Sequence, residues 1–115
     1  MVTKIDLKDW AFLYDNLERL NTKIQLLKMK CTSGSILEYK LKRIEHDRNI
    51  VIEEIEHIEA AVEALPALER DLIFLRYREG KPWVYISLEL GYSEDYVRGK
   101  LHKKALAFLR DYENT

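Results

Sequence analysis

Cysteine and long apolar runs are almost absent from this sequence. Cys31 is the single cysteine, so no disulfide can form within the chain, which fits a reducing cytoplasm. No run of 18 apolar residues is present, so no membrane-spanning helix is expected. The first ten residues, MVTKIDLKDW, lack the apolar stretch of a secretory signal peptide. These absences predict a cytoplasmic protein without a membrane partner.

Glycine and proline are also scarce, with four and two residues among 115. Apolar residues make up 47% and charged residues 34%, a composition typical of a helical globular protein. We therefore predict an all-α fold, with one domain or one small domain plus an appendage. The net charge of −1 excludes a general polycation, so any binding of nucleic acid must depend on a local basic patch.

Motifs for catalysis and for metal or cofactor binding are missing as well. The sequence has no H-E-x-x-H, no C-x-x-C and no glycine-rich phosphate loop. His46 and His57 would lie roughly 16 Å apart along one helix, which is too far for a shared metal ion. We therefore expect no enzyme activity, no metal site, no cofactor and no small-molecule substrate.

Heptad spacing dominates residues 1–64, which we expect to form a first domain. Apolar residues recur at intervals of three and four along two predicted helices, as in the seam of a coiled coil. The connection KCTSGS predicts an antiparallel helical hairpin, in which Gly34 ends the first helix and Ser35 caps the second. The seam residues expected to serve oligomerisation are Trp10, Leu13, Leu17, Leu20, Ile24, Leu27, Ile44, Arg48, Val51, Ile55 and Ile58.

A two-helix hairpin buries only one narrow stripe of each helix, so it needs a further surface to pack against. That surface comes either from the rest of the chain or from a second copy, and we expect a homodimer. Tyr39, Ile50 and Ile52 lie off the seam and are candidates for this second contact. Arg48 has two interpretations, because a charge in a seam can fix register or oligomeric state, or can extend outward on its aliphatic stem.

The second half, residues 65–115, consists of short apolar patterns separated by breakers. Pro66 suits the first turn of a helix that REGKP ends. Gly91 then turns the chain between PWVYISLEL and a helix over residues 93–111, which Ser93 caps. Two helices joined by a tight glycine turn are a candidate helix-turn-helix unit. One departure is that the second helix has its next inward residue at Leu101, one place later than many such units.

A helical wheel at 100° per residue divides the helix 93–111 into two faces. The inward face is expected to contain Val97, Leu101, Lys104 and Phe108, with Lys104 at its rim and Ala105 at its edge. The outward face centres on Gly99 and is flanked by Tyr96, Lys100, Lys103, Asp95, Arg98 and His102. A mid-helix glycine costs about 1 kcal/mol relative to alanine. A glycine at this position therefore suggests that the helix approaches the floor of a DNA groove closely, while its basic side chains contact the phosphates of either wall. The alternative is an ordinary solvated basic face.

Residues 65–110 also carry a family resemblance. The opening LP, the helix ending LRYREG, the turn I-x-x-x-L-G-x-S and the piece V-R-x-x-L-H-K resemble region 4 of bacterial sigma factors. A long helical N-terminus before such a three-helix module is similar to small phage and prophage regulators, such as the ArpU-type late-gene regulators. The resemblance implies DNA contacts from Ser93, Tyr96, Arg98, Gly99 and Lys100, and contacts to the DNA backbone from Lys81 and Trp83.

These features predict a sequence-specific transcriptional regulator, encoded by a phage or prophage, that binds double-stranded DNA through helix 93–111. One alternative is a phage DNA-packaging protein of the small-terminase kind. Another is a protein that binds RNA polymerase or a sigma factor through this module without touching DNA. Separately, the acidic later part of the second helix is either a solvated helix surface or a docking surface for RNA polymerase or a basic partner helix. The residues expected at the DNA are Lys81, Trp83, Ser93, Asp95, Tyr96, Arg98, Gly99, Lys100, His102 and Lys103.

Overall fold

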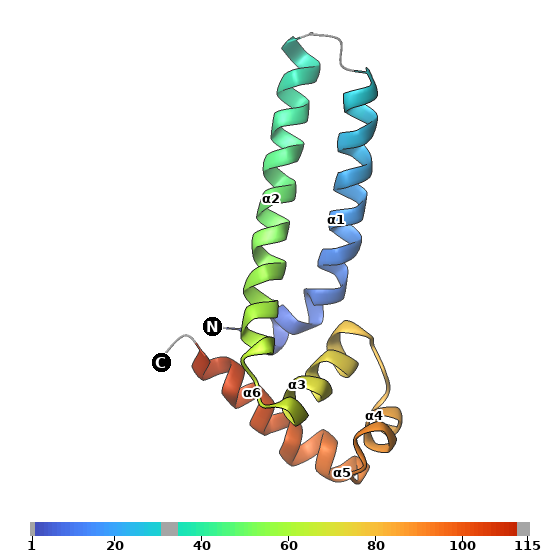
Figure 1. The fold of residues 1–115 in the computed structure, drawn as a ribbon, viewed down its shortest axis with the longest axis vertical. Coiled ribbons are helices and arrows are strands. Elements are labelled where there is room, and N and C mark those ends of the chain that lie inside the picture. Colours follow the sequence, from blue (N-terminus) through green and yellow to red (C-terminus); the bar gives the residue numbers. More distant parts are fainter. Residues whose placement is uncertain (1, 31–34, 113–115) are drawn as a thin grey trace. The chain divides into compact units, whose positions relative to one another are not determined.

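The computed structural model describes residues 2–30 and 35–112, which form helices joined by short connections (Figure 1). The elements are α1 (Lys4–Lys30), α2 (Ser35–Glu63), α3 (Ala67–Ile73), η1 (Phe74–Arg78), α4 (Trp83–Leu90), α5 (Glu94–Tyr96), η2 (Val97–Leu101) and α6 (His102–Asp111). The two η elements are π-helical turns, in which an N–H bonds to the carbonyl five residues earlier. No strand occurs in the described ranges, which confirms the all-α class.

Some expectations concern parts of the chain that the structure does not describe. Cys31 and Gly34 lie outside the described residues, and so does the side chain of Ser35, although Ser35 itself begins α2. Within the described ranges, no helix combines the length and the apolar character that crossing a membrane requires.

The chain divides into two compact units. Unit 1 comprises Met1–Ala11 together with His57–Thr115, and unit 2 comprises Phe12–Glu56. The expected boundary between residues 64 and 65 therefore falls inside unit 1. The physical reason is that the beginning of α1 and the end of α2 contribute to the core of the C-terminal helices. The ring of Trp10, for example, meets that of Phe74 edge-on, with 6.2 Å between the centroids.

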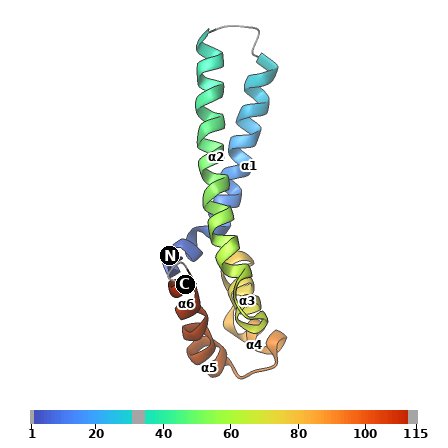
Figure 2. The same cartoon turned by 60° about the vertical axis from the view of Figure 1, so that its left-hand side comes forward.

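In unit 2, α1 and α2 lie side by side and run in opposite directions (Figures 1 and 2). None of the predicted seam residues is exposed, in this unit or in unit 1. In unit 2 the seam residues Ile24 and Ile55 are buried, at 4% and 6% exposure, and the other seam residues are partly buried. Arg48 keeps its stem in the seam, because its Nε atom is buried and has no hydrogen-bond partner in the described part of the chain.

Unit 1 builds its core from short helices that start and stop at recognisable residues. Thr3 and Asp6 begin α1 as a reciprocal cap, since each backbone N–H donates to the other's side-chain oxygen, at 2.9 and 3.3 Å. Pro66 and Pro82 immediately precede α3 and α4. α6 packs on α3, and α4 packs on α5 and η2. The fully buried side chains of this core are Val2, Leu7, Leu72, Ile73, Ile86, Val97, Leu101 and Leu109.

Candidate nucleic-acid interface

The turn between α4 and α5 has the geometry that the sequence predicts. Gly91 adopts the left-handed conformation with φ of 78°, and its N–H donates to the Ser87 carbonyl at 2.9 Å. This closes α4, and glycine meets no steric penalty there. Ser93 then accepts the Tyr96 N–H at its Oγ atom, at 3.2 Å. Both the glycine turn and the serine cap are therefore confirmed.

The segments α5, η2 and α6 follow one another without a break from Glu94 to Asp111. The buried residues of this helix are Val97, Leu101, Ala105 and Leu109, each at most 1% exposed, together with His102. The expected inward position of Phe108 is wrong, whereas the exposure of Lys104 is compatible with its expected place at the rim. Phe108 is 43% exposed, and Lys104 reaches over the surface to place its Nζ 3.5 Å from the Oε1 atom of the buried Glu69.

The π-turn explains this error. The His102 N–H bonds to the Val97 carbonyl five residues earlier, so η2 holds one residue more than an α-turn. Every residue after it is rotated back by about 100° relative to a regular wheel. The rotation carries Ala105 and Leu109 into the core and turns Phe108 outward. The late inward position of Leu101 was the sign of this extra residue in the sequence.

The expected place of His102 on the outward face is wrong for the same reason. His102 is 8% exposed, and its Nε2 lies 2.6 Å from the Tyr77 hydroxyl in a hydrogen bond. Trp83 meets the imidazole edge-on, with 4.9 Å between the centroids, and the Arg76 guanidinium covers the same indole at 4.5 Å. His102 and Trp83 therefore belong to the internal packing of unit 1.

Burial lowers the pKa of His102 to about 4, with smaller contributions from the charges of Lys4 and Arg76. The folded protein therefore holds His102 neutral, whereas the unfolded chain protonates a histidine near pH 6.5. Between these two values the unfolded state binds more protons, so acidification favours unfolding. Burial also raises the pKa of Tyr77, so the Tyr77 hydroxyl stays protonated across this range.

We expect the His102 contribution to stability to be complete above pH 6.5 and to fall as the pH drops towards 4, by about 3 kcal/mol in total. Urea denaturation at several pH values, comparing the parent with His102→Gln, isolates this contribution because glutamine does not titrate. His46→Gln is the control, because His46 is exposed. Identical pH profiles for the parent and His102→Gln would contradict the assignment.

The outward face of this helix retains three cations and a bare glycine. Lys100 and Lys103 are exposed, and Gly99 is partly exposed. A Cβ at Gly99 would meet no atom within 4 Å, and the φ angle of Gly99 is not positive. The fold itself therefore does not need a glycine at this position. Arg98 lies 3.7 Å from both Glu94 and Asp95, so its charge is partly neutralised by the first turn of its own helix.

The remaining predicted residues lie just before α4 and around the turn after it. Lys81 holds its Nζ 5.0 Å from the centre of the Tyr85 ring, and Tyr96 stacks at a tilt on Tyr92, with 5.2 Å between the centroids. Ser93 is occupied as the helix cap, and Asp95 is an exposed acid. Tyr85 and Tyr92 were missed by sequence reasoning. The available signal was spacing, since each lies four residues from the side chain it contacts.

The described residues contain no group of three or more histidine, cysteine, aspartate or glutamate side chains that could hold a metal ion.

No family model matches the chain, and no curated protein or solved structure matches it either.

Proposed function

We propose that this protein is a transcriptional regulator that binds double-stranded DNA through the outward face of residues 94–111. In this interpretation α4 and the helix after Gly91 form a helix-turn-helix module in the manner of sigma-factor region 4, and α1 and α2 form a helical hairpin. The observation that carries the proposal is the pairing of a bare, unconstrained Gly99 with exposed cations on both sides of it. The resemblance of residues 65–110 supports the same assignment.

DNA binding gives a physical reason for a glycine that the fold does not require. A helix in the major groove approaches the base edges closely, and a position without a side chain allows closer approach. Lys100 and Lys103 suit phosphate contacts, because an ammonium is a compact point charge. Arg98 has the planar fork that reads a guanine edge.

The ion pairs of Arg98 do not prevent this role. Exposed pairs of this kind contribute only about 0–1 kcal/mol, so a phosphate or a base edge can replace Glu94 and Asp95 as the partner. Where Arg98 contacts neither a phosphate nor a base, Glu94 and Asp95 repel the DNA backbone. This repulsion favours one orientation of the helix on DNA over others. The contact set that we propose is Lys81, Tyr96, Arg98, Gly99, Lys100 and Lys103, without the internally packed His102 and Trp83.

The exposed apolar residues of α4 favour a second function, binding to RNA polymerase or another protein. Leu88 is 79% exposed and Val84 is 54% exposed, one helical turn apart on the same face. Tyr85 is exposed beside them. An apolar surface of this kind marks protein interfaces more often than DNA interfaces. Selection of bound sites from random duplex DNA decides between the two functions, because recovery of a common sequence requires direct binding.

We expect Lys100→Ala and Lys103→Ala each to weaken binding to all duplexes alike. Each is expected to reduce the slope of log affinity against log salt by about one, because one released counterion is lost with each phosphate contact. Fluorescence anisotropy with a labelled duplex over a salt series measures both quantities. Lys8→Ala is the matched control, since Lys8 is an exposed cation of the same unit on a different helix. An equal loss in the Lys8 variant, or unchanged slopes in the other two, would overturn the proposed face.

A further inference from the structure

Unit 2 has a charge asymmetry along its length that the proposed DNA interface does not use. Residues 23–43, which we call the tip, contain six basic residues and one acidic residue, a net charge of +5. Residues 12–22 and 44–56, which we call the stem, contain seven acidic residues and two basic ones, a net charge of −5. The hairpin is therefore neutral as a whole, with one basic half and one acidic half.

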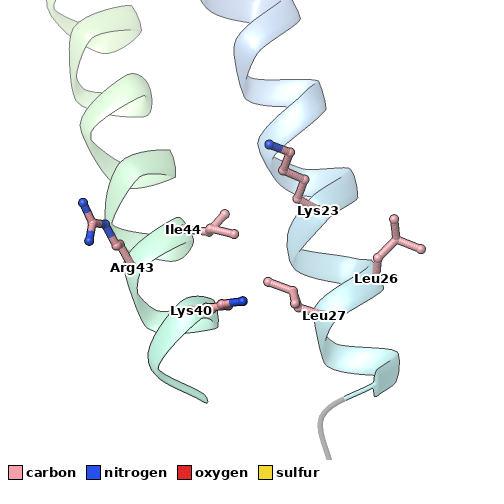
Figure 3. Close-up of a pocket in the computed structure, with 6 residues that line it drawn as sticks. All are labelled: Lys23, Leu26, Leu27, Lys40, Arg43 and Ile44. Carbon is pink, nitrogen blue, oxygen red and sulfur yellow. The ribbon is translucent and has the colours of Figure 1, made fainter. Parts of the chain in front are cut away.

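The tip contains a groove between α1 and α2 with a volume of about 340 Å³. Leu27 and Ile44 point into the space between the two helices and form its apolar floor (Figure 3), and Leu26 also lines the groove. Cations surround this floor, supplied by Lys23, Lys40 and Arg43. An apolar floor with a basic rim fits an amphipathic helix whose exposed face combines apolar and acidic side chains.

The stem of α2 has such a face. Beside the buried seam, a second set of residues on α2 follows heptad spacing, and all its members are exposed. This outer stripe consists of Ile36, Lys40, Arg43, Asp47, Ile50 and Glu54. Its charged residues are basic in the tip and acidic in the stem, and Ile50 supplies an apolar side chain that is 42% exposed. Heptad spacing is the pattern with which one helix packs along another.

We infer that a second copy of this chain packs antiparallel against the outer stripe, with the tip of each hairpin against the stem of the other. This orientation places Lys40 and Arg43 of each copy near Asp47 and Glu54 of the other, twice by symmetry. It also brings Ile50 of each copy to the apolar floor of the other copy's groove. A parallel arrangement would instead put basic against basic and acidic against acidic. The inference does not depend on DNA binding.

Charge reversal in the full chain tests this interface. Lys40→Glu with Arg43→Glu makes the tip part of the outer stripe acidic, and Asp47→Lys with Glu54→Lys makes its stem part basic. We expect sedimentation at micromolar concentration to give a dimer for the parent and a monomer for each double variant. The quadruple variant, which carries both sets, is expected to be a dimer again. The control is Lys8→Glu with Arg110→Glu, which changes the net charge equally at exposed residues outside unit 2 and should remain a dimer.

Mixing the parent with the quadruple variant determines the orientation. In an antiparallel dimer the basic tip part of the parent's outer stripe meets the basic stem part of the variant's stripe, so native mass spectrometry should show the two homodimers and little mixed species. A parallel arrangement would favour the mixed dimer, because the tip parts of the two stripes would then carry opposite charges. A monomeric parent, double variants that remain dimers, a quadruple variant that stays monomeric, or a dominant mixed dimer would each overturn the inference.

Discussion

Deletion of Gly99 is expected to leave the unfolding free energy within about 1 kcal/mol of that of the parent. Insertion of an alanine between Lys100 and Leu101 is expected to lower the unfolding free energy by about 3 kcal/mol or more. The deletion removes the extra residue of the π-turn, so Val97 and Leu101 become three residues apart. At 100° per residue, Ala105 and Leu109 then stay on the buried side of a regular α-helix.

The insertion has the opposite effect, because the helix already contains one extra residue. A second one rotates Ala105 and Leu109 by about another 100°, away from α3 and out of the core. Chemical denaturation followed by circular dichroism measures both changes in the unfolding free energy. The two variants are matched, since they alter the same turn by one small residue. If deletion and insertion destabilised the protein equally, the π-turn would not be the element that sets the register of α6.

Leu101→Ala is expected to destabilise the protein by about 3 kcal/mol, within the 2–5 kcal/mol range typical of a buried leucine truncated to alanine. Leu101 is 1% exposed and lies in η2, which packs on α4 and α6. Truncation leaves a cavity between elements that the short helices of unit 1 cannot easily close. Denaturant midpoints for the parent and the variant provide the measurement.

Leu88→Ala is the control for this truncation. Leu88 belongs to the neighbouring α4 and is 79% exposed, so the same chemical change should alter the unfolding free energy by less than about 0.5 kcal/mol. The pair therefore separates burial from helix propensity, which is identical for the two substitutions. Equal losses would mean that Leu88 is covered in solution, and would be evidence for a partner on that face.

Much of the local structure followed from short signals in the sequence. Gly91 and Ser93 mark a helix end and a helix start because each satisfies a backbone requirement within a few residues. Heptad spacing located the buried side of α1 and α2, because the side of a regular helix is determined by residue number alone. The described elements therefore match the expected all-α class and the expected turn.

The candidate interface was only partly predictable. Gly99 is partly exposed and Lys100 and Lys103 are exposed, as expected for the outward side. His102 is buried and Phe108 is exposed, which is the reverse of the expectation. The reason is that a wheel at a constant 100° per residue cannot represent a turn that holds an extra residue. The ion pairs of Arg98 could have been predicted from the sequence, since Glu94 and Asp95 lie four and three residues before it.

By itself the sequence determined the helical class, the glycine turn, the serine cap and the unexposed side of α1 and α2, all of which depend on neighbours within about one or two turns. Only the tertiary structure decided that Trp10 belongs with Phe74, that His102 is held neutral against Tyr77, and that Glu69 is buried beside Lys104. These contacts join residues far apart in the chain, and their formation depends on how several helices fill one core together. The π-turn belongs to the same class, since packing of η2 on α4 and of α6 on α3 compensates for its irregular backbone.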